Sequence, residues 1–172
     1  MRQPKKLADE DVLYDYAVKA LGRRMRSVAE LKRLLRQRAA PGSEAVIERV
    51  VARLKEYKYL NDSAYAAAYS SYRKENEKFG PRRVISDLKA RGVHGDVVRK
   101  AVADAFAGTD EEQHAREFLR RKRIARPADD RGAARIFRTL MRAGFSTRAA
   151  LRVLNKWNVD SEVLSALESE GE

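Results

Sequence analysis

The amino-acid sequence predicts an all-α fold in which three tandem three-helix repeats form an elongated, curved body. Three observations lead to this prediction. One helix–loop–helix pattern occurs three times along the 172 residues, and such internal repetition is typical of tandem-repeat architectures. Apolar residues recur with the 3.6-residue period of an amphipathic helix, and no segment has the alternation of a β-strand. Glycine and proline stand where helices should begin or end.

The clearest copy of the pattern runs from Gly80 to Val102. Moving it forward by 52 residues places Gly80 on Gly132 and Gly92 on Gly144. The apolar pairs that superpose are Val84 and Ile136, Ile85 and Phe137, Leu88 and Leu140, Val93 and Phe145, Ala101 and Val153, and Val102 and Leu154. Chance rarely aligns two glycines with six apolar positions, so the two segments are interpreted as repeats of one unit.

A third copy precedes these two. Moving the pattern backward places Gly80 on Ser27, Val84 on Leu31 and Leu88 on Leu35. A slightly longer loop, Ala40 to Ser43, then restores the register of the following helix. With that loop, Val97, Val98 and Val102 superpose on Val46, Ile47 and Val51.

In the first repeat, we expect a leading helix over Asp11–Leu21. The next helix begins at a capping box, because the Ser27 hydroxyl can accept from the Glu30 amide while the Glu30 carboxylate accepts from the Ser27 amide. The dipeptide Pro41–Gly42 closes this helix.

In the second repeat, we expect a leading helix that Asp62 caps and that runs to about Lys78. Gly80 then stands at an N-cap, with Pro81 at the first helical position, where its missing amide proton costs nothing. Gly92 occupies the position of a left-handed C-terminal cap and is followed by apolar Val93.

The third repeat has a leading helix that starts near Asp110 and ends near Ile124. Its second helix ends at Gly144–Phe145, as the second repeat ends at Gly92–Val93. The start of that helix has two interpretations. Gly132 could stand at the N-cap, or Asp129 and Asp130 could cap the helix and leave Gly132 inside it at a cost of about 1 kcal/mol.

The repeats divide the chain into a lead at 1–11, repeats at 12–61, 62–108 and 109–158, and an acidic tail at 159–172 with a short amphipathic segment at Ser161–Leu167. The net charge of +12 is unevenly distributed, with +7, +3 and +7 on the three repeats and −5 on the tail. Basic repeats favour an anionic partner, either nucleic acid or an acidic protein surface.

The residue types present exclude several kinds of chemistry. The chain has no cysteine, which removes disulfides, thiolate metal sites and cysteine nucleophiles. His94 and His114 have no other ligand-type residue at a suitable spacing, so we predict no metal site and expect both at the surface. No phosphate-binding glycine loop or nucleophile elbow occurs. We predict no catalytic residue and no cofactor.

The chain also lacks targeting and membrane signals. No apolar run approaches the roughly 20 residues that cross a bilayer. The first residues have no apolar signal-peptide core. We expect a soluble, cytoplasmic protein.

Aromatic residues have two interpretations. Tyr65, Tyr69 and Tyr72 share one helical face and could stack nucleobases. The same spacing is what a helix uses to face its core, and we favour core packing. Trp157 is in register with Val153 and is also expected in the core.

Arginine and lysine form stripes on the helix faces that the apolar residues leave free. Like charges at i, i+4 destabilise a helix, so a stripe without acidic partners indicates an anionic ligand rather than a solvated face. Arginine suits phosphate and carboxylate because of its planar fork. The candidate partner- or nucleic-acid-binding residues are Lys19, Arg23, Arg26, Lys32, Arg36, Arg82, Arg83, Arg116, Arg120, Arg121, Lys122, Arg123, Arg131, Arg135, Arg138, Arg142, Arg148 and Arg152, and Lys156 continues the last stripe.

Several short motifs of the first two repeats resemble the bacterial RecX family, whose members regulate the RecA recombinase. These motifs are Arg26–Ser27 with Glu30–Leu31 and Leu35, then Tyr59–Asp62 with Ala66, then Gly80, Arg83, Leu88 and Gly92–Val93. The third repeat agrees in period and in its Gly144–Phe145 ending but is generic in sequence.

The resemblance implies a protein of three tandem three-helix repeats that is not an enzyme. It implies binding along the groove of the RecA–DNA filament, with restraint of strand exchange, ATP hydrolysis and co-protease activity. The expected partners are the RecA filament and the DNA within it, with free DNA as a further candidate. We expect the protein to be a monomer.

A DNA-binding protein with helix-turn-helix-like units is the alternative. Its recognition helices would be Arg131–Arg142 or Arg148–Lys156 in the major groove. Base readout usually needs Asn, Gln or Ser beside Arg, and these stripes are nearly pure arginine. Specific base readout is therefore not expected.

Overall fold

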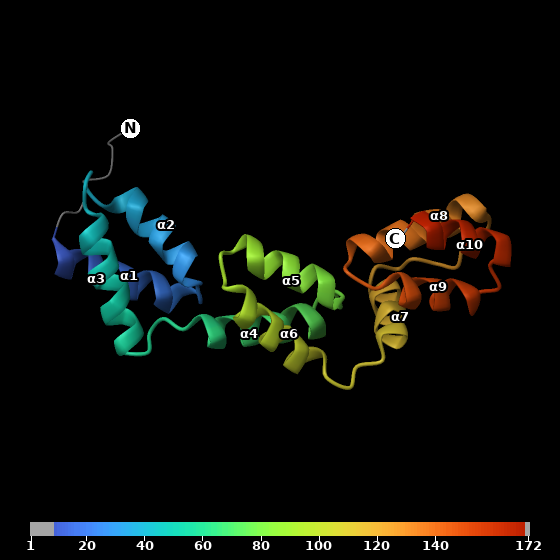
Figure 1. Ribbon diagram of the computed structural model, residues 1–172, viewed down its shortest axis with the longest axis horizontal. Coiled ribbons are helices and arrows are strands. Elements are labelled where there is room, and N and C mark those ends of the chain that lie inside the picture. Colours follow the sequence, from blue (N-terminus) through green and yellow to red (C-terminus); the bar gives the residue numbers. More distant parts are fainter. Residues whose placement is uncertain (1–8, 171–172) are drawn as a thin grey trace. The chain divides into compact units, whose positions relative to one another are not determined.

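The computed structural model describes residues 9–170, which form ten α-helices and no β-strand (Figure 1). The helices are α1 (Glu10–Arg23), α2 (Val28–Arg38), α3 (Glu44–Glu56), α4 (Asp62–Glu75), α5 (Pro81–Ala90), α6 (Gly95–Phe106), α7 (Glu111–Arg121), α8 (Asp130–Arg142), α9 (Thr147–Asn155) and α10 (Ser161–Glu170). Residues 1–8 of the predicted lead and the last two residues of the predicted tail lie outside the described residues. The all-α repeat prediction is confirmed.

The chain groups into two compact units. Within the described residues, the first unit comprises 9–66 with Leu88–Val98, and the second comprises Ala67–Asp87 with 99–170. Helices α1, α2 and α3 belong to the first unit, and α7 to α10 belong to the second. Helices α4, α5 and α6 each contribute a segment to both units.

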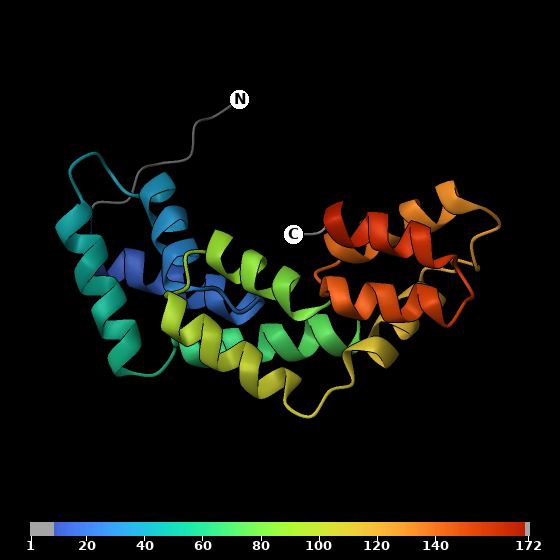
Figure 2. The ribbon, with the colours of Figure 1, turned by 45° about the vertical axis from the view of Figure 1, so that its right-hand side comes forward.

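In the first unit, α1, α2 and α3 pack against one another (Figures 1 and 2). Their apolar faces meet in a core that includes Leu13, Leu31, Leu35, Ile47 and Leu54, all essentially inaccessible to solvent. Leu31, Leu35 and Ile47 are the apolar positions that the repeat pattern predicts. Burial of such side chains is the main stabilising contribution to a helix of this kind.

In the second unit, α9 packs against α7, α8 and α10. The core between them includes Phe137, Leu140, Phe145 and Leu154. The predicted amphipathic segment at Ser161–Leu167 is the first part of α10, and Leu167 is buried in the same core. The described part of the acidic tail, up to Glu170, is therefore part of the folded unit.

The repeat register is confirmed. Leu88 and Leu140 are both completely buried. Gly92 and Gly144 both have left-handed backbone, with φ of 76° and 91°, as C-terminal caps require. The start of the third copy follows the aspartate interpretation, because the Asp129 carboxylate accepts from the Gly132 amide at 2.7 Å and α8 begins before the glycine.

The start of α4 corrects one predicted cap. The Asn61 side chain, not that of Asp62, accepts from the backbone amides of Ser63 and Ala64, at 2.9 and 3.1 Å. The Asp62 carboxylate instead accepts from the amide of Val28, the first residue of α2, at 2.8 Å. Both residues are good caps, and a contact between distant segments decides between them. Helix α4 also ends at Glu75, before the predicted Lys78.

The surface position predicted for His114 is wrong. Its side chain is buried, and its ring packs against Phe106 and Phe145. Its Nε2 lies 3.0 Å from the Phe79 carbonyl oxygen, which can only accept, so Nε2 carries the proton. Burial lowers the pKa of His114, since desolvation disfavours the charged ring.

The tyrosine stripe of α4 is core only in part. Tyr65 is buried and Tyr69 is half-buried. Tyr72 is 55% exposed, so the core interpretation is wrong for that residue. Burial and the nearby Glu30 carboxylate raise the pKa of Tyr65. Trp157 is half-buried and packs against the core of the second unit.

A joint between helix ends occurs once in each unit. In the first unit, the Ser27 hydroxyl donates to the Arg91 carbonyl oxygen at 2.6 Å, so the start of α2 meets the end of α5. A Cβ on Gly92 would lie 2.4 Å from the Ala29 Cβ. The Arg91 guanidinium also donates to the Glu30 carboxylate at 2.7 Å.

In the second unit, the start of α5 meets the end of α8. The Gly80 amide donates to the Ala143 carbonyl at 2.9 Å, and the Arg82 amide donates to the Gly144 carbonyl at 3.1 Å. Helix ends leave such amides and carbonyls without partners inside the helix. We call these two contacts helix-end joints, and the repeat pattern aligns Ser27 with Gly80 and Gly92 with Gly144.

Candidate anion-binding interface

The arginine stripe of α8 is the most regular cationic surface. Arg131, Arg135, Arg138 and Arg142 are all exposed. The opposite face of α8 is buried in the core of the second unit and sets the direction of the stripe. Within residues 9–170, Arg131, Arg135 and Arg142 make no ion pair, and each presents an uncompensated guanidinium.

Arg138 differs from its neighbours because α10 supplies an acid. Its guanidinium lies 3.3 Å from the Glu170 carboxylate, and both side chains are more than half exposed, at 53% and 55%. Exposed pairs of this kind contribute about 0–1 kcal/mol. The pair therefore reduces the local positive charge, but it is weak enough for Arg138 to exchange Glu170 for another anion.

Helix α9 carries exposed cations of its own. Arg148 and Arg152 are exposed and, among the described residues, form no ion pair. Lys156, just after α9, contacts the Glu112 carboxylate of α7 at 2.8 Å. Glu112 also pairs with Arg116, so one acid serves two cations.

The cluster at the end of α7 is the densest run of cations. Arg120, Arg121, Lys122 and Arg123 are exposed. The Lys122 ammonium lies 5.9 Å from the centre of the Phe118 ring. Arg123 has left-handed backbone, with φ of 55°, and its amide donates to the Arg120 carbonyl as the helix ends.

In the first unit, the predicted stripe has two parts with different surroundings. Lys19 and Arg23 are exposed on α1. Arg26 is half-buried, and its Nε is inaccessible and without a hydrogen-bond partner.

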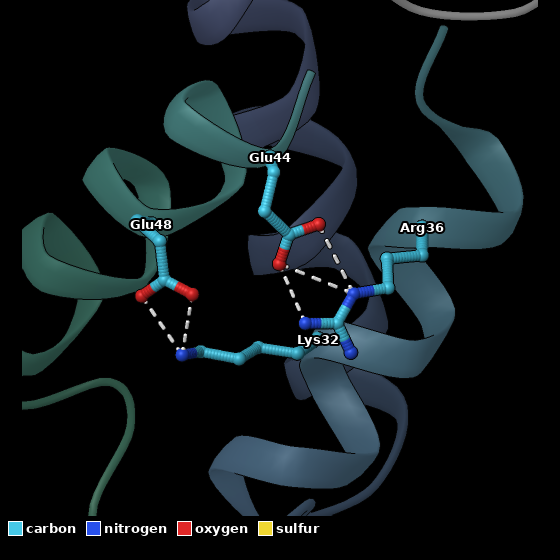
Figure 3. Close-up of polar contacts among 4 residues, drawn as sticks. All are labelled: Lys32, Arg36, Glu44 and Glu48. Atoms are coloured by element: carbon cyan, nitrogen blue, oxygen red, sulfur yellow. Dashed lines mark hydrogen bonds and ion pairs between the residues drawn. The ribbon is translucent and has the colours of Figure 1, made fainter. Parts of the chain in front are cut away.

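Lys32 and Arg36 on α2 face two acids of α3 (Figure 3). The Lys32 ammonium lies 2.6 Å from the Glu48 carboxylate, and the Arg36 guanidinium lies 2.5 Å from that of Glu44. The hydrogen bond from Arg36 lowers the pKa of Glu44, and the same bond raises the pKa of Arg36. These two cations already have partners inside the unit.

Arg82 and Arg83 follow the start of α5. Arg82 is exposed, and its amide takes part in the helix-end joint of the second unit. The Arg83 guanidinium contacts the Asp87 carboxylate at 3.1 Å, and Asp87 also accepts from Arg73 at 2.6 Å. Arg83 is therefore part of an internal network.

The structure places two residues in a cavity for which the sequence analysis predicted no binding role. Arg126, between α7 and α8, lines a cavity together with Arg116, Arg120, Lys156 and Trp157. Arg126 belongs to no helix, so helical periodicity could not place it. Trp157 was expected in the core; it packs against the core but is only half-buried, and it also lines this cavity.

Two kinds of feature are absent from the described residues, namely metal-ligand clusters and helices that could span a membrane. Residues 9–170 contain no group of three His, Asp or Glu side chains that could hold a metal ion. No described helix is long and apolar enough to cross a membrane.

Comparison with known families identifies the first two helix triplets. The family model described as "RecX, first three-helix domain" matches residues 14–54. The family model described as "RecX, second three-helix domain" matches residues 61–102. The matched ranges cover most of α1 to α3 and of α4 to α6.

A relative that matches over most of both chains decides the family. The chain is 38% identical over 138 residues to the regulatory protein RecX of Leptothrix cholodnii, covering 80% of this chain and 84% of the relative. The chain belongs to the RecX family. The RecX protein of Bacillus velezensis is 30% identical over 166 residues, which are 92% of this chain and 61% of that protein. The chain thus spans less than two thirds of that longer relative.

A solved RecX structure has the same fold. The crystal structure of RecX from Lactobacillus salivarius superposes with a TM-score of 0.68 at 18% identity, covering 87% of this chain and 96% of that one. This likeness extends the RecX fold beyond the two matched domains.

Proposed function

We propose that this RecX-family chain is a non-enzymatic modulator, and specifically an inhibitor, of the RecA recombinase. It binds along the groove of the RecA–DNA filament through its basic helix faces. Binding there restrains strand exchange, ATP hydrolysis and co-protease activity. The chain acts as a monomer, and its partners are the recombinase and the DNA within the filament.

The observation that carries this proposal is the uncompensated arginine stripe of α8 in a RecX-family fold. Arg131, Arg135 and Arg142 are exposed without an acid partner in the described residues. Repulsion within such a stripe costs a few tenths of a kcal/mol for each i, i+4 pair. An anionic partner removes that cost, and both DNA phosphates and acidic protein surfaces are anionic.

Repetition suits a filament. A filament presents the same groove surface many times, and a row of repeats can make a modest contact at each. Once one contact forms, the next is intramolecular and benefits from effective concentration. Affinity can therefore accumulate without one dominant site.

The test is charge reversal of the unpaired part of the stripe. We expect the triple variant Arg131→Glu, Arg135→Glu, Arg142→Glu to lose affinity for the RecA–DNA filament and inhibition of strand exchange, while its helical circular dichroism is unchanged. Arg138 is left intact, because a glutamate there would repel Glu170 and confuse a folding effect with a binding effect.

A matched control carries the same change of net charge elsewhere. Arg33, Lys55 and Lys89 are exposed, and the structure gives them no ion pair within residues 9–170. Their reversal to glutamate should weaken filament binding less than reversal of the α8 stripe. If the stripe variant inhibits as well as the parent does, α8 is a solvated surface and the proposal loses its main support.

Salt dependence and competition separate protein contacts from DNA contacts. Affinity falls as salt rises, and each lost phosphate contact should make the plot of log affinity against log salt less steep, by about 0.7 to 0.9. Contacts with recombinase carboxylates should persist on recombinase without DNA. A preference for naked duplex over filament in a competition assay would favour the helix-turn-helix alternative instead.

A further inference from the structure

A cavity of about 420 Å³ lies in the second unit, beside α7 and the end of α9. Sites for small ligands typically range from about 300 to 1,000 Å³. The cavity combines four cations, Arg116, Arg120, Arg126 and Lys156, with one aromatic side chain, Trp157. Helices α7 and α9 pack directly against each other, so the residues come from a fixed framework (Figure 1).

The acids around the cavity already have cationic partners. Glu112 contacts both Arg116 and Lys156. Glu117, which also lines the cavity, contacts Lys78 at 3.1 Å. Arg120 and Arg126 are exposed and form no ion pair with any residue in the described part of the chain. The cavity therefore keeps an excess of positive charge.

Trp157 gives the cavity its one aromatic side chain. It packs against the core of the second unit and is only half-buried, so it both belongs to the core and lines the cavity. Nucleobases stack on such aromatic surfaces in proteins that bind single strands. Guanidinium groups bind phosphate through paired hydrogen bonds.

We propose that this cavity binds one nucleotide unit of single-stranded DNA. The base stacks on the Trp157 indole, and Arg120 and Arg126 bind the adjoining phosphate. A duplex fits poorly, because its bases are already stacked on one another. An acidic peptide could use the cations but would leave the indole without a partner. The site deepens the proposed function, on which it rests for bringing single-stranded DNA within reach.

The chain provides its own reporter, since Trp157 is its single tryptophan. Intrinsic fluorescence should be measured on the full chain during titration with short oligothymidylate, without recombinase. The controls are an abasic oligomer of the same length and charge, and oligoglutamate. We expect oligothymidylate to quench Trp157 strongly and to bind more tightly than either control.

Variants test the two halves of the site with labelled oligothymidylate. Trp157→Ala should weaken binding about 5- to 150-fold, the equivalent of about 1–3 kcal/mol for one stacked base. Trp157→Phe keeps a smaller ring and should recover part of this loss. Arg126→Ala should make the plot of log affinity against log salt less steep by about 0.7, the value of one single-strand phosphate contact. Arg33→Ala, on α2, is the charge-matched control and should leave that slope unchanged.

Folding and function are kept separate in these measurements. Trp157→Ala removes a core contact, so its thermal midpoint is measured first, and Arg126→Ala gives an independent result because that side chain is exposed. Equal quenching by the abasic oligomer, or unchanged binding by both Trp157→Ala and Arg126→Ala, would overturn the proposal. Because recombinase is absent, that failure would leave filament binding, and hence the proposed function, unaffected.

Discussion

Leu88 and Leu140 occupy equivalent positions in two repeats, one in each compact unit, and neither side chain is accessible to solvent. We expect Leu88→Ala and Leu140→Ala each to lower the free energy of unfolding by about 2–5 kcal/mol, through lost contacts and the cavity left behind. Chemical denaturation measures this. Val12→Ala, at a position that is 46% exposed, is the control and should change much less. A small effect at either leucine would contradict the assigned core face.

His114 links stability to pH. Burial lowers its pKa in the folded state below the ordinary value of 6.5. The unfolded chain therefore binds a proton at a higher pH than the folded chain does, so stability should fall as the pH is lowered through 6.5. The difference in denaturation midpoint between the parent and His114→Gln, followed across this range, isolates the effect. A difference that is independent of pH would show that the ring titrates as freely as in the unfolded chain.

At the scale of helices, the helix-end joint of the second unit depends on the absence of a side chain. A Cβ on Gly80 would lie 2.4 Å from the Gly144 carbonyl oxygen, which is backbone and cannot easily move. We expect Gly80→Ala to destabilise the protein by about 1–3 kcal/mol, as overpacking does. Gly22→Ala is the control, because a Cβ there meets nothing within 4 Å. It should be neutral or stabilising by up to about 1 kcal/mol. Equal denaturation midpoints for Gly80→Ala and Gly22→Ala would show that the two helix ends of the joint can move apart at little cost.

Local signals explain why most helices could be predicted. The capping box of Ser27 and Glu30 and the left-handed Gly92 and Gly144 act within a few residues, and all occur as predicted. The role of Asp62 could not be predicted, because its carboxylate caps α2 from 34 residues away in sequence. The buried position of His114 could not be predicted either, because its ring nitrogen bonds to the carbonyl of Phe79, which lies between α4 and α5.

At the scale of the whole molecule, charge is balanced by acids that come from other helices. Exposure of the α8 and α9 arginines follows from helical periodicity. The pairing of Lys32, Arg36 and Arg138 does not, since their acids lie on α3 and α10. The repeat boundaries, the elongated curved body and the role of every candidate binding residue stay predictions.

The acidic helix α10 gives a test of this charge balance. Glu170→Gln frees Arg138, whereas Glu168→Gln removes the same charge from an exposed residue that has no ion pair in the described chain. If the proposed function holds, Glu170→Gln should strengthen filament binding more, by up to about 1 kcal/mol, the value of an exposed pair. Equilibrium binding at low salt measures the difference. Equal gains for the two variants would mean that only net charge matters.

The two helix-end joints have the same direction along the chain. In each joint, the start of one repeat's second helix meets the end of the corresponding helix in the next repeat. The first repeat offers no such receiving end, because α2 stops at Ala39 in extended backbone, with ψ of 155°, rather than at a left-handed glycine. In the third repeat the position equivalent to Ser27 and Gly80 is Gly132, which lies inside α8 rather than at its N-cap, with its amide bonded to the Asp129 carboxylate. Repeat arrays need terminal units that do not invite further stacking. A designed extra joint would therefore need a left-handed glycine at the receiving helix end and a helix start at the N-cap position, as Gly144 and Gly80 provide.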